Sequence, residues 1–107
     1  MKLMTKDIEQ IAQAQYPQGD DMDQLVVAKF FNPAVSSWAW YLMNQDPENP
    51  DYLWGIVKGI ETEMGSFSLS ELESLRLDSG FVIVRDLHFK PIKAIDLWNK
   101  LQNEENA

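Results

Sequence analysis

The fold is decided by Ser37-Trp38-Ala39-Trp40-Tyr41-Leu42-Met43, a run of large apolar residues near the middle of the chain. Successive side chains of a β-strand point to opposite faces of its sheet. One face therefore receives two tryptophans and a leucine, and the other receives an alanine, a tyrosine and a methionine. Because both faces are apolar, we expect the sheet to be covered on both sides.

Other strands are predicted on both sides of this run from their β-branched and aromatic content. The predicted strands cover residues 24–31, 52–57, 60–67 and 81–89. Asn32-Pro33 ends the first of them, and the Pro-containing loop 44–51 separates the central run from the next. Gly59 and Gly65 mark a hairpin turn, a bulge or a bend, and the sequence leaves these three alternatives open.

Three helices are predicted from their boundary residues. Thr5 caps a first helix that reaches Tyr16 and is ended by Pro17 and Gly19. Ser68-Leu69-Ser70-Glu71 fits a capping box, in which the side chains of Ser and Glu bond each other's backbone N–H groups. The helix that it opens is ended by Asp78-Ser79-Gly80. Pro91 is suited to the first position of the last helix.

The resulting order is α-β-β-β-β-α-β-α. Strands that are grouped, rather than alternating regularly with helices, favour an α+β fold. We expect a mainly antiparallel, twisted sheet of about five strands with three helices. Residues 1–102 are predicted to form one domain, followed by a frayed acidic tail over residues 103–107.

Composition excludes several classes of protein. The chain of 107 residues has nine Lys and Arg against seventeen Asp and Glu, a formal net charge of −8, and no Cys. A disulfide framework, thiolate metal sites and thiol nucleophiles are therefore excluded. No apolar run reaches the ~20 residues of a membrane span, and the first ten residues do not resemble a signal peptide. We therefore expect a cytoplasmic protein. Its acidity argues against direct binding of nucleic acid or of an anionic membrane.

Much of the negative charge falls in two loops, at Asp20, Asp21, Asp23, Asp46, Glu48 and Asp51. The simpler interpretation is solubility, since net charge keeps small domains apart. The sharper hypothesis is an acidic surface that meets a basic surface on a protein partner, where charge complementarity speeds the encounter and fixes its register.

A second group of charges is the alternative candidate site. Glu61 and Glu63 share one strand face, and Arg85 lies in an apolar row of the strand over 81–89. A buried Arg needs a carboxylate partner, so we expect an ion pair with one of these glutamates. Such a pair is either structural or the floor of a polar pocket. On the opposite face, Asp86 and His88 are spaced i, i+2, which does not by itself place a carboxylate on the imidazole.

We assign no catalytic residue, no metal ligand and no cofactor. Ser68 and Ser70 are better explained as helix caps than as nucleophiles, and the strained turn of a nucleophile elbow is missing. One His without Cys gives no zinc-ligand spacing, and no EF-hand, phosphate loop or dinucleotide motif occurs.

The aromatic residues on neighbouring strands allow two interpretations. They are Trp38, Trp40, Tyr41, Tyr52 and Trp54. Core packing is the more common role for large rings. The alternative is an exposed patch that binds a protein partner, because Trp and Tyr are enriched at interface hot spots. On that alternative we place Trp38 and Trp40 in the partner-binding surface.

From residue 26 to residue 91 the sequence resembles the DUF2958 family, small bacterial proteins of unknown function common on plasmids, integrative elements and phages. The resemblance is carried by KFFNP (29–33), WAWY (38–41), WGIV (54–57), ETEMG (61–65), FSLSELE (67–73) and RDLHFKP (85–91). Ser66 and Val84 depart from the family pattern, which has an aromatic and an acid there. The resemblance implies a mobile-element context and supplies no catalytic residue.

Three hypotheses follow. The first is a non-enzymatic module that docks its acidic, aromatic-bearing surface on a basic protein, in the manner of an anti-CRISPR or anti-restriction inhibitor. The second is a small-ligand-binding or hydrolytic domain built around Glu61, Glu63, Arg85 and His88. The third is a homodimer formed through a sheet edge or face; otherwise the protein is a monomer.

Overall fold

The computed structural model describes residues 2–78 and 82–106. Within them, the strands form a five-stranded antiparallel sheet in the order β5-β4-β3-β2-β6 and a two-stranded antiparallel sheet, β1-β7. In chain order the elements are α1 (Lys6–Ala14), the 3-10 helix η1 (Tyr16–Gln18), β1 (Leu25–Val26), β2 (Ala28–Asn32), β3 (Val35–Gln45), β4 (Tyr52–Lys58), β5 (Thr62–Ser68), α2 (Leu69–Asp78), β6 (Val84–Arg85), β7 (Ile92–Lys93) and α3 (Ala94–Glu105). The predicted α+β class and element order are confirmed.

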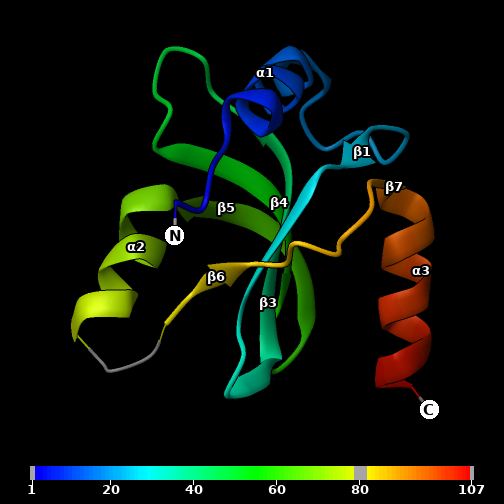
Figure 1. The fold of residues 1–107 in the computed structure, drawn as a ribbon. Helices are drawn as coiled ribbons and strands as arrows, with labels where there is room; N and C mark the ends of the chain where they lie inside the picture. The colour runs from blue at the N-terminus through cyan, green and yellow to red at the C-terminus, as the bar shows by residue number, and fades with distance from the viewer. Residues whose placement is uncertain (1, 79–81, 107) are drawn as a thin grey trace.

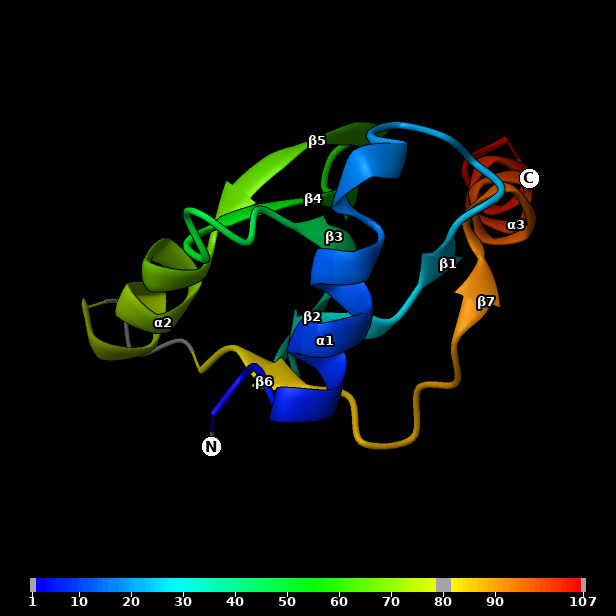
Figure 2. The same ribbon diagram turned by 90° about the horizontal axis from the view of Figure 1, so that it is seen from above.

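The central strand β3 divides the core into two parts. Leu42 is fully buried on one face, among residues of α1, α2 and the N-terminal segment. Tyr41 and Met43 are buried on the other face, against α3. Figures 1 and 2 show α2 and α3 on opposite sides of the sheet, with α1 lying across one end. The alternation expected from the central run is thus confirmed, and both faces are covered.

The predicted Thr5 cap and the Ser68 half of the predicted capping box are confirmed. The Thr5 hydroxyl accepts a hydrogen bond from the Ile8 N–H at 3.2 Å, at the start of α1. The Ser68 hydroxyl accepts one from the Glu71 N–H at 3.2 Å, at the start of α2. A second acceptor at α2 comes from outside the helix, because the Asp51 carboxylate receives the Ser70 N–H at 2.7 Å. These bonds satisfy donors that the helix itself leaves unpaired.

Two predicted boundaries near the small sheet are wrong. The segment 24–31 forms two strands, because β1 pairs with β7 while β2 pairs with β3. Pro91 does not open the last helix. Residues 92–93 continue as β7, and the Ala94 N–H then bonds the Gln24 carbonyl at 2.9 Å where α3 begins.

The predictions for 81–89 and for the tail also need correction. Phe81 lies outside the described residues, and the strand there is limited to β6. After it the chain turns, because the Asp86 carboxylate accepts the His88 N–H at 2.9 Å and removes that donor from strand pairing. The tail is not frayed as far as Glu105, since α3 reaches this residue and its carboxylate accepts the Thr62 N–H.

A glycine allows β4 to approach β3 closely beside a bulge. The register between these strands shifts between Leu42 and Asn44, which leaves Met43 as the extra residue. A Cβ added at Gly55, opposite Leu42, would lie 1.8 Å from the Tyr41 carbonyl oxygen. Gly65 faces Gly55 across β4 and β5, yet a Cβ there would meet nothing within 4 Å.

We predict that Gly55→Ala lowers the free energy of unfolding by at least about 2 kcal/mol, because a backbone oxygen cannot give way as a side chain can. Gly65→Ala is the matched control and should change it by less than about 1 kcal/mol. Urea unfolding followed by tryptophan fluorescence measures both. Equal stability of the two variants would show that the close approach at Gly55 is wrong.

Candidate functional site

The structure brings the two acidic loops together, although more than twenty residues separate them in the sequence. The Asn44 side-chain amide donates a hydrogen bond to the Gly19 carbonyl at 2.9 Å. The Tyr16 hydroxyl donates one to the Asp46 carboxylate at 3.2 Å. Because Gly19 precedes the first acidic loop and Asp46 opens the second, these bonds place both loops at one end of the molecule.

Buried amide side chains hold this end in shape. Gln24 donates to the carbonyls of Gly19 and Asp21, each at 2.8 Å. Asn44 also donates to the Gln24 side chain at 2.9 Å, and Gln45 donates to the Pro50 carbonyl at 2.6 Å. Gln24, Asn44 and Gln45 are at most 2% exposed. Residues 44–45, expected in a solvated loop, therefore belong to β3 and fix the backbone of both loops.

Gln15, at the end of α1, ties β1 to β3 in the same region. Its amide group donates to the Leu25 carbonyl at 3.0 Å and to the Met43 carbonyl at 2.6 Å. Its side-chain oxygen accepts the Leu25 N–H at 3.0 Å. Sequence reasoning missed this network, because Gln and Asn beside a strand look like the solvated start of a loop.

An open pocket of about 480 Å³ lies between the loops. Its lining combines three aromatic rings with a carboxylate and an amide, contributed by Tyr16, Gly19, Asp20, Asn44, Tyr52 and Trp54. Tyr16 and Tyr52 are 36% and 39% exposed, so each ring presents a face to solvent. The pocket is thus both aromatic and acidic.

The two segments around the pocket carry a negative charge. Residues 16–24 and 44–52 contain no Lys or Arg, and each segment has three carboxylates, so together they carry −6 of the net charge of −8. The pKa of the Tyr16 hydroxyl is raised, first by the charge of Asp46 and to a smaller extent by Glu48. A phenolate is disfavoured here because neighbouring carboxylates repel it.

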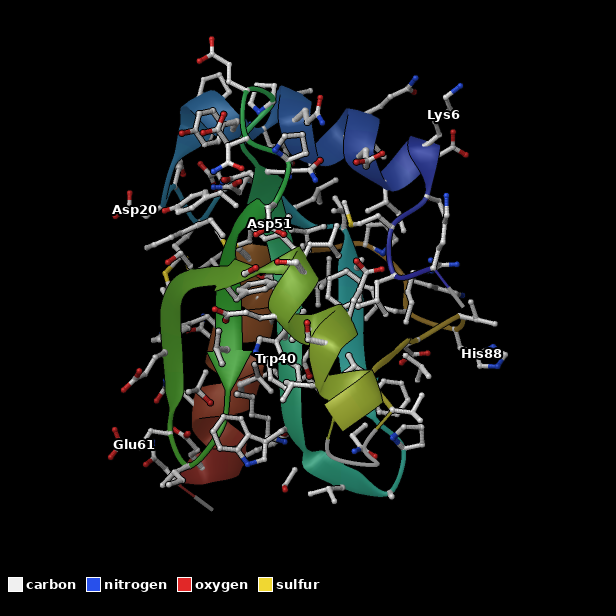
Figure 3. All side chains as sticks on the ribbon, turned by 90° about the vertical axis from the view of Figure 1, so that its left-hand side faces the viewer. Lys6, Asp20, Trp40, Asp51, Glu61 and His88 are labelled. Atoms are coloured by element: carbon white, nitrogen blue, oxygen red, sulfur yellow. The ribbon has the colours of Figure 1, made fainter. Side chains whose placement is uncertain are left out.

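The aromatic residues of the pocket are not the ones predicted for partner binding. Trp38 lies seven residues before Gln45 on β3, roughly 20 Å along the strand, and is 41% exposed beside Gly59. Trp40 packs against the core on the α2 side and is labelled beside that helix in Figure 3. One sequence signal could have indicated a pocket ring, because Tyr52 directly follows Asp51 of the second acidic loop.

Asp51 is the loop acid whose carboxylate is bound to the start of α2. It accepts hydrogen bonds from the Ser68 hydroxyl at 2.7 Å and from the Ser70 hydroxyl at 3.1 Å, in addition to the Ser70 N–H. These bonds, that of Ser68 first, lower the pKa of Asp51. A weaker base is poorly suited to activate a serine, so the cluster is a helix cap.

The expected ion pair between Arg85 and a glutamate is not formed. Arg85 lies on β6 and Glu63 on β5, which are the opposite edges of the sheet and roughly 19 Å apart across four strand spacings. The Arg85 guanidinium instead donates to the carbonyls of Lys2 and Leu3, at 2.7 and 2.9 Å. It is satisfied by backbone oxygens of the N-terminal segment.

The rest of the alternative polar site is dispersed as well. Figure 3 shows Glu61 and His88 at opposite edges of the molecule. Asp86 and His88 lie in a turn rather than on a strand face, and their contact runs from the His88 N–H to the carboxylate, so the imidazole is not oriented by it. The groups of the second hypothesis therefore do not converge.

Two features are absent from the described residues, 2–78 and 82–106. No three side chains among their His, Asp and Glu lie close enough to hold a metal ion. None of their helices has both the length and the apolar composition needed to cross a membrane.

These features define a small α+β protein with an acidic, aromatic-lined pocket between two loops. The chain belongs to the DUF2958 family, whose model carries the description "Protein of unknown function" and matches residues 3–107. The expected family resemblance is thus confirmed. Comparisons with curated proteins and with solved structures gave no match.

We predict that Asn44→Asp lowers the free energy of unfolding at pH 7 by about 2–3 kcal/mol. The new carboxylate would face the oxygens of Gly19 and Gln24 in a buried site, so its folded pKa is raised above the unfolded value. Stability is then recovered as pH falls, because the protonated form restores a donor. Asn49→Asp, in the exposed part of the loop, adds the same charge as a control. Denaturant unfolding at pH 7 and pH 5 measures the free energy of unfolding of each variant relative to the wild type. The loss should be smaller at pH 5 than at pH 7 for Asn44→Asp only.

A second prediction concerns Asp51, whose folded pKa is lowered. Its contribution to stability is present above the unfolded pKa and is lost as pH falls through the folded pKa. Asp51→Asn should therefore destabilise the protein at pH 7 by under about 1 kcal/mol, and the difference should vanish at the acidic end of the titration. Glu73→Gln, at an exposed position of the helix α2 that Asp51 caps, is the control. If Asp51→Asn lowers the free energy of unfolding by the same amount at every pH, the charge of Asp51 does not contribute to the cap and the prediction is wrong.

Proposed function

We propose that the protein is a non-enzymatic binding module that docks its acidic end on a basic surface of a protein partner. The observation that carries the proposal is the meeting of two distant acidic loops around one aromatic-lined pocket. A negative surface of this kind attracts a positive one, raises the rate of encounter and fixes the register of docking.

The rigidity of the acidic end supports this role. Like charges repel one another, so two acidic loops separate unless they are held. Here Asn44 and Gln24 hold the first loop, and Gln45 holds the second, in each case by hydrogen bonds from a buried side-chain amide to a backbone carbonyl. A surface that is ordered before binding loses less conformational entropy on association.

The chemistry of the partner follows from the same charges. A nucleic acid would be repelled, whereas a protein that binds nucleic acids has the basic groove that such a surface complements. Mobile genetic elements encode small acidic inhibitors of host defence, and the family resemblance implies that context. The specific form of the proposal is therefore an inhibitor that occupies the basic groove of a defence protein inside the cell.

An enzymatic role is less well supported, because the polar groups considered for it are separate. Arg85 is satisfied by backbone carbonyls, His88 is exposed in a turn, and Glu61 lies at the far edge of the sheet. The carboxylate of Asp51, which contacts Ser68 and Ser70, caps a helix.

The test is a matched pair of charge-reversal variants. Asp20, Asp23 and Glu48 are exposed, and changing each to Lys raises the net charge by six. Changing Glu61, Glu63 and Glu73 to Lys gives the same net charge at exposed positions away from the loops. Affinity capture from the source cell identifies the partner, and calorimetry with purified proteins gives the dissociation constants.

We expect the loop variant to bind the partner about a hundredfold more weakly than the wild type, because it removes the complementary charges. The control variant should bind the partner within about threefold of the wild type, and this small loss reflects the changed net charge alone. Circular dichroism verifies that both variants fold. If the loop variant captures and binds the partner as the wild type does, docking through the acidic end is wrong.

A further inference from the structure

We infer that the pocket between the loops receives an arginine side chain of the partner, stacked on its aromatic rings. The inference rests on the proposed function and specifies the group that the acidic end recognises. It draws on the composition of the pocket as well as on the charge of its rim.

The aromatic lining favours a cation that can lose part of its water. Tyr16, Tyr52 and Trp54 come from three places in the chain, namely η1, the start of β4 and its middle. Cations are attracted to the faces of such rings, Trp most strongly. Tyr16 and Tyr52 are each more than a third exposed as residues, so an incoming group reaches them without unfolding of the loops.

The carboxylates determine the sign of the occupant. Asp20 lines the pocket directly, and Asp46 is held at its edge by the Tyr16 hydroxyl. The second Asp46 oxygen accepts the Glu48 N–H at 2.8 Å, which fixes the carboxylate at the rim. An anionic ligand such as a phosphate is therefore repelled. A neutral aromatic ligand would form no ionic interaction with these carboxylates.

Between the two cationic side chains, the pocket favours arginine. A guanidinium is planar and weakly hydrated, stacks on aromatic rings and bonds a carboxylate with two parallel N–H groups. A lysine ammonium is compact and strongly hydrated, so it gains less from rings and loses more on leaving water. A bare metal ion has too few oxygen ligands here, since the described residues bring no three carboxylates together.

The indole N–H of Trp54 gives a direct readout. It is buried and has no hydrogen-bond partner among the described residues. The chain has four tryptophans, so an NMR spectrum shows at most four indole N–H signals, and the Trp54 signal is assigned by its loss in Trp54→Phe. An occupant stacked in the pocket shifts this signal, whereas one held only by the rim charges does not.

The experiment titrates the full chain with hexaarginine and, separately, with hexalysine. We expect hexaarginine to bind about tenfold more tightly than hexalysine and to shift the Trp54 signal. Tyr52→Leu should abolish the difference between the peptides, and Tyr52→Phe should retain it because the ring remains. Trp38→Leu, which removes an exposed ring about 20 Å away, should leave the difference unchanged.

The outcomes separate this inference from the proposed function. If both peptides bind equally, release together at high salt and leave the Trp54 signal unmoved, the arginine pocket is wrong while electrostatic docking survives. If neither peptide binds at low salt, both the pocket and the docking surface are overturned. If hexaarginine still binds more tightly to Tyr52→Leu, with the same shift of Trp54, the site of recognition lies elsewhere and the inference fails.

Discussion

The structure depends on a single strand that is apolar on both faces. Large side chains of β3 alternate between the two sides of the sheet, and exposing either side to water would cost a large part of the stability of so small a domain. The chain must therefore supply two covering layers from only 107 residues. It does so with α1 and α2 on one side of β3 and α3 on the other. The rest of the chain has little length left for elements that do not serve this covering.

The candidate site is the continuation of the same strand. After the bulge at Met43, the side chains of β3 change from apolar to amide while remaining buried. Asn44 and Gln45 then bond the backbones of the two loops. A buried polar group needs a hydrogen-bond partner. Here the hydrogen bonds of two buried amides fix the backbones of the loops that carry six carboxylates. The fold and the acidic surface are therefore coupled through a few hydrogen bonds.

Local signals made part of this structure predictable. Thr5 and Ser68 cap helices because their hydroxyls bond N–H groups three residues on, a relation contained within four residues of sequence. The alternation of residues 37–43 is equally local. The errors concern partners that are distant in sequence. Arg85 was expected to pair with a glutamate, but strand order places β6 and β5 at opposite edges, and no short-range pattern specifies that order. The split of residues 24–31 has the same origin, since β7, more than sixty residues later, takes β1 as its partner.

The pocket was unpredictable for the same reason, and this bears on how function is built in a small domain. Its rings and acids come from segments that the sequence separates, and none of them forms a recognisable motif alone. An active site needs several groups held to within about half an ångström by supporting residues, and a short chain with two cores to cover has few residues for such support. A charged surface tolerates far looser placement, because Coulomb attraction falls slowly with distance. Fixing the backbone of two loops is enough, and three buried amides achieve it: Gln24, Asn44 and Gln45. The proposed binding through charge and aromatic rings therefore requires no more structural support than this architecture provides.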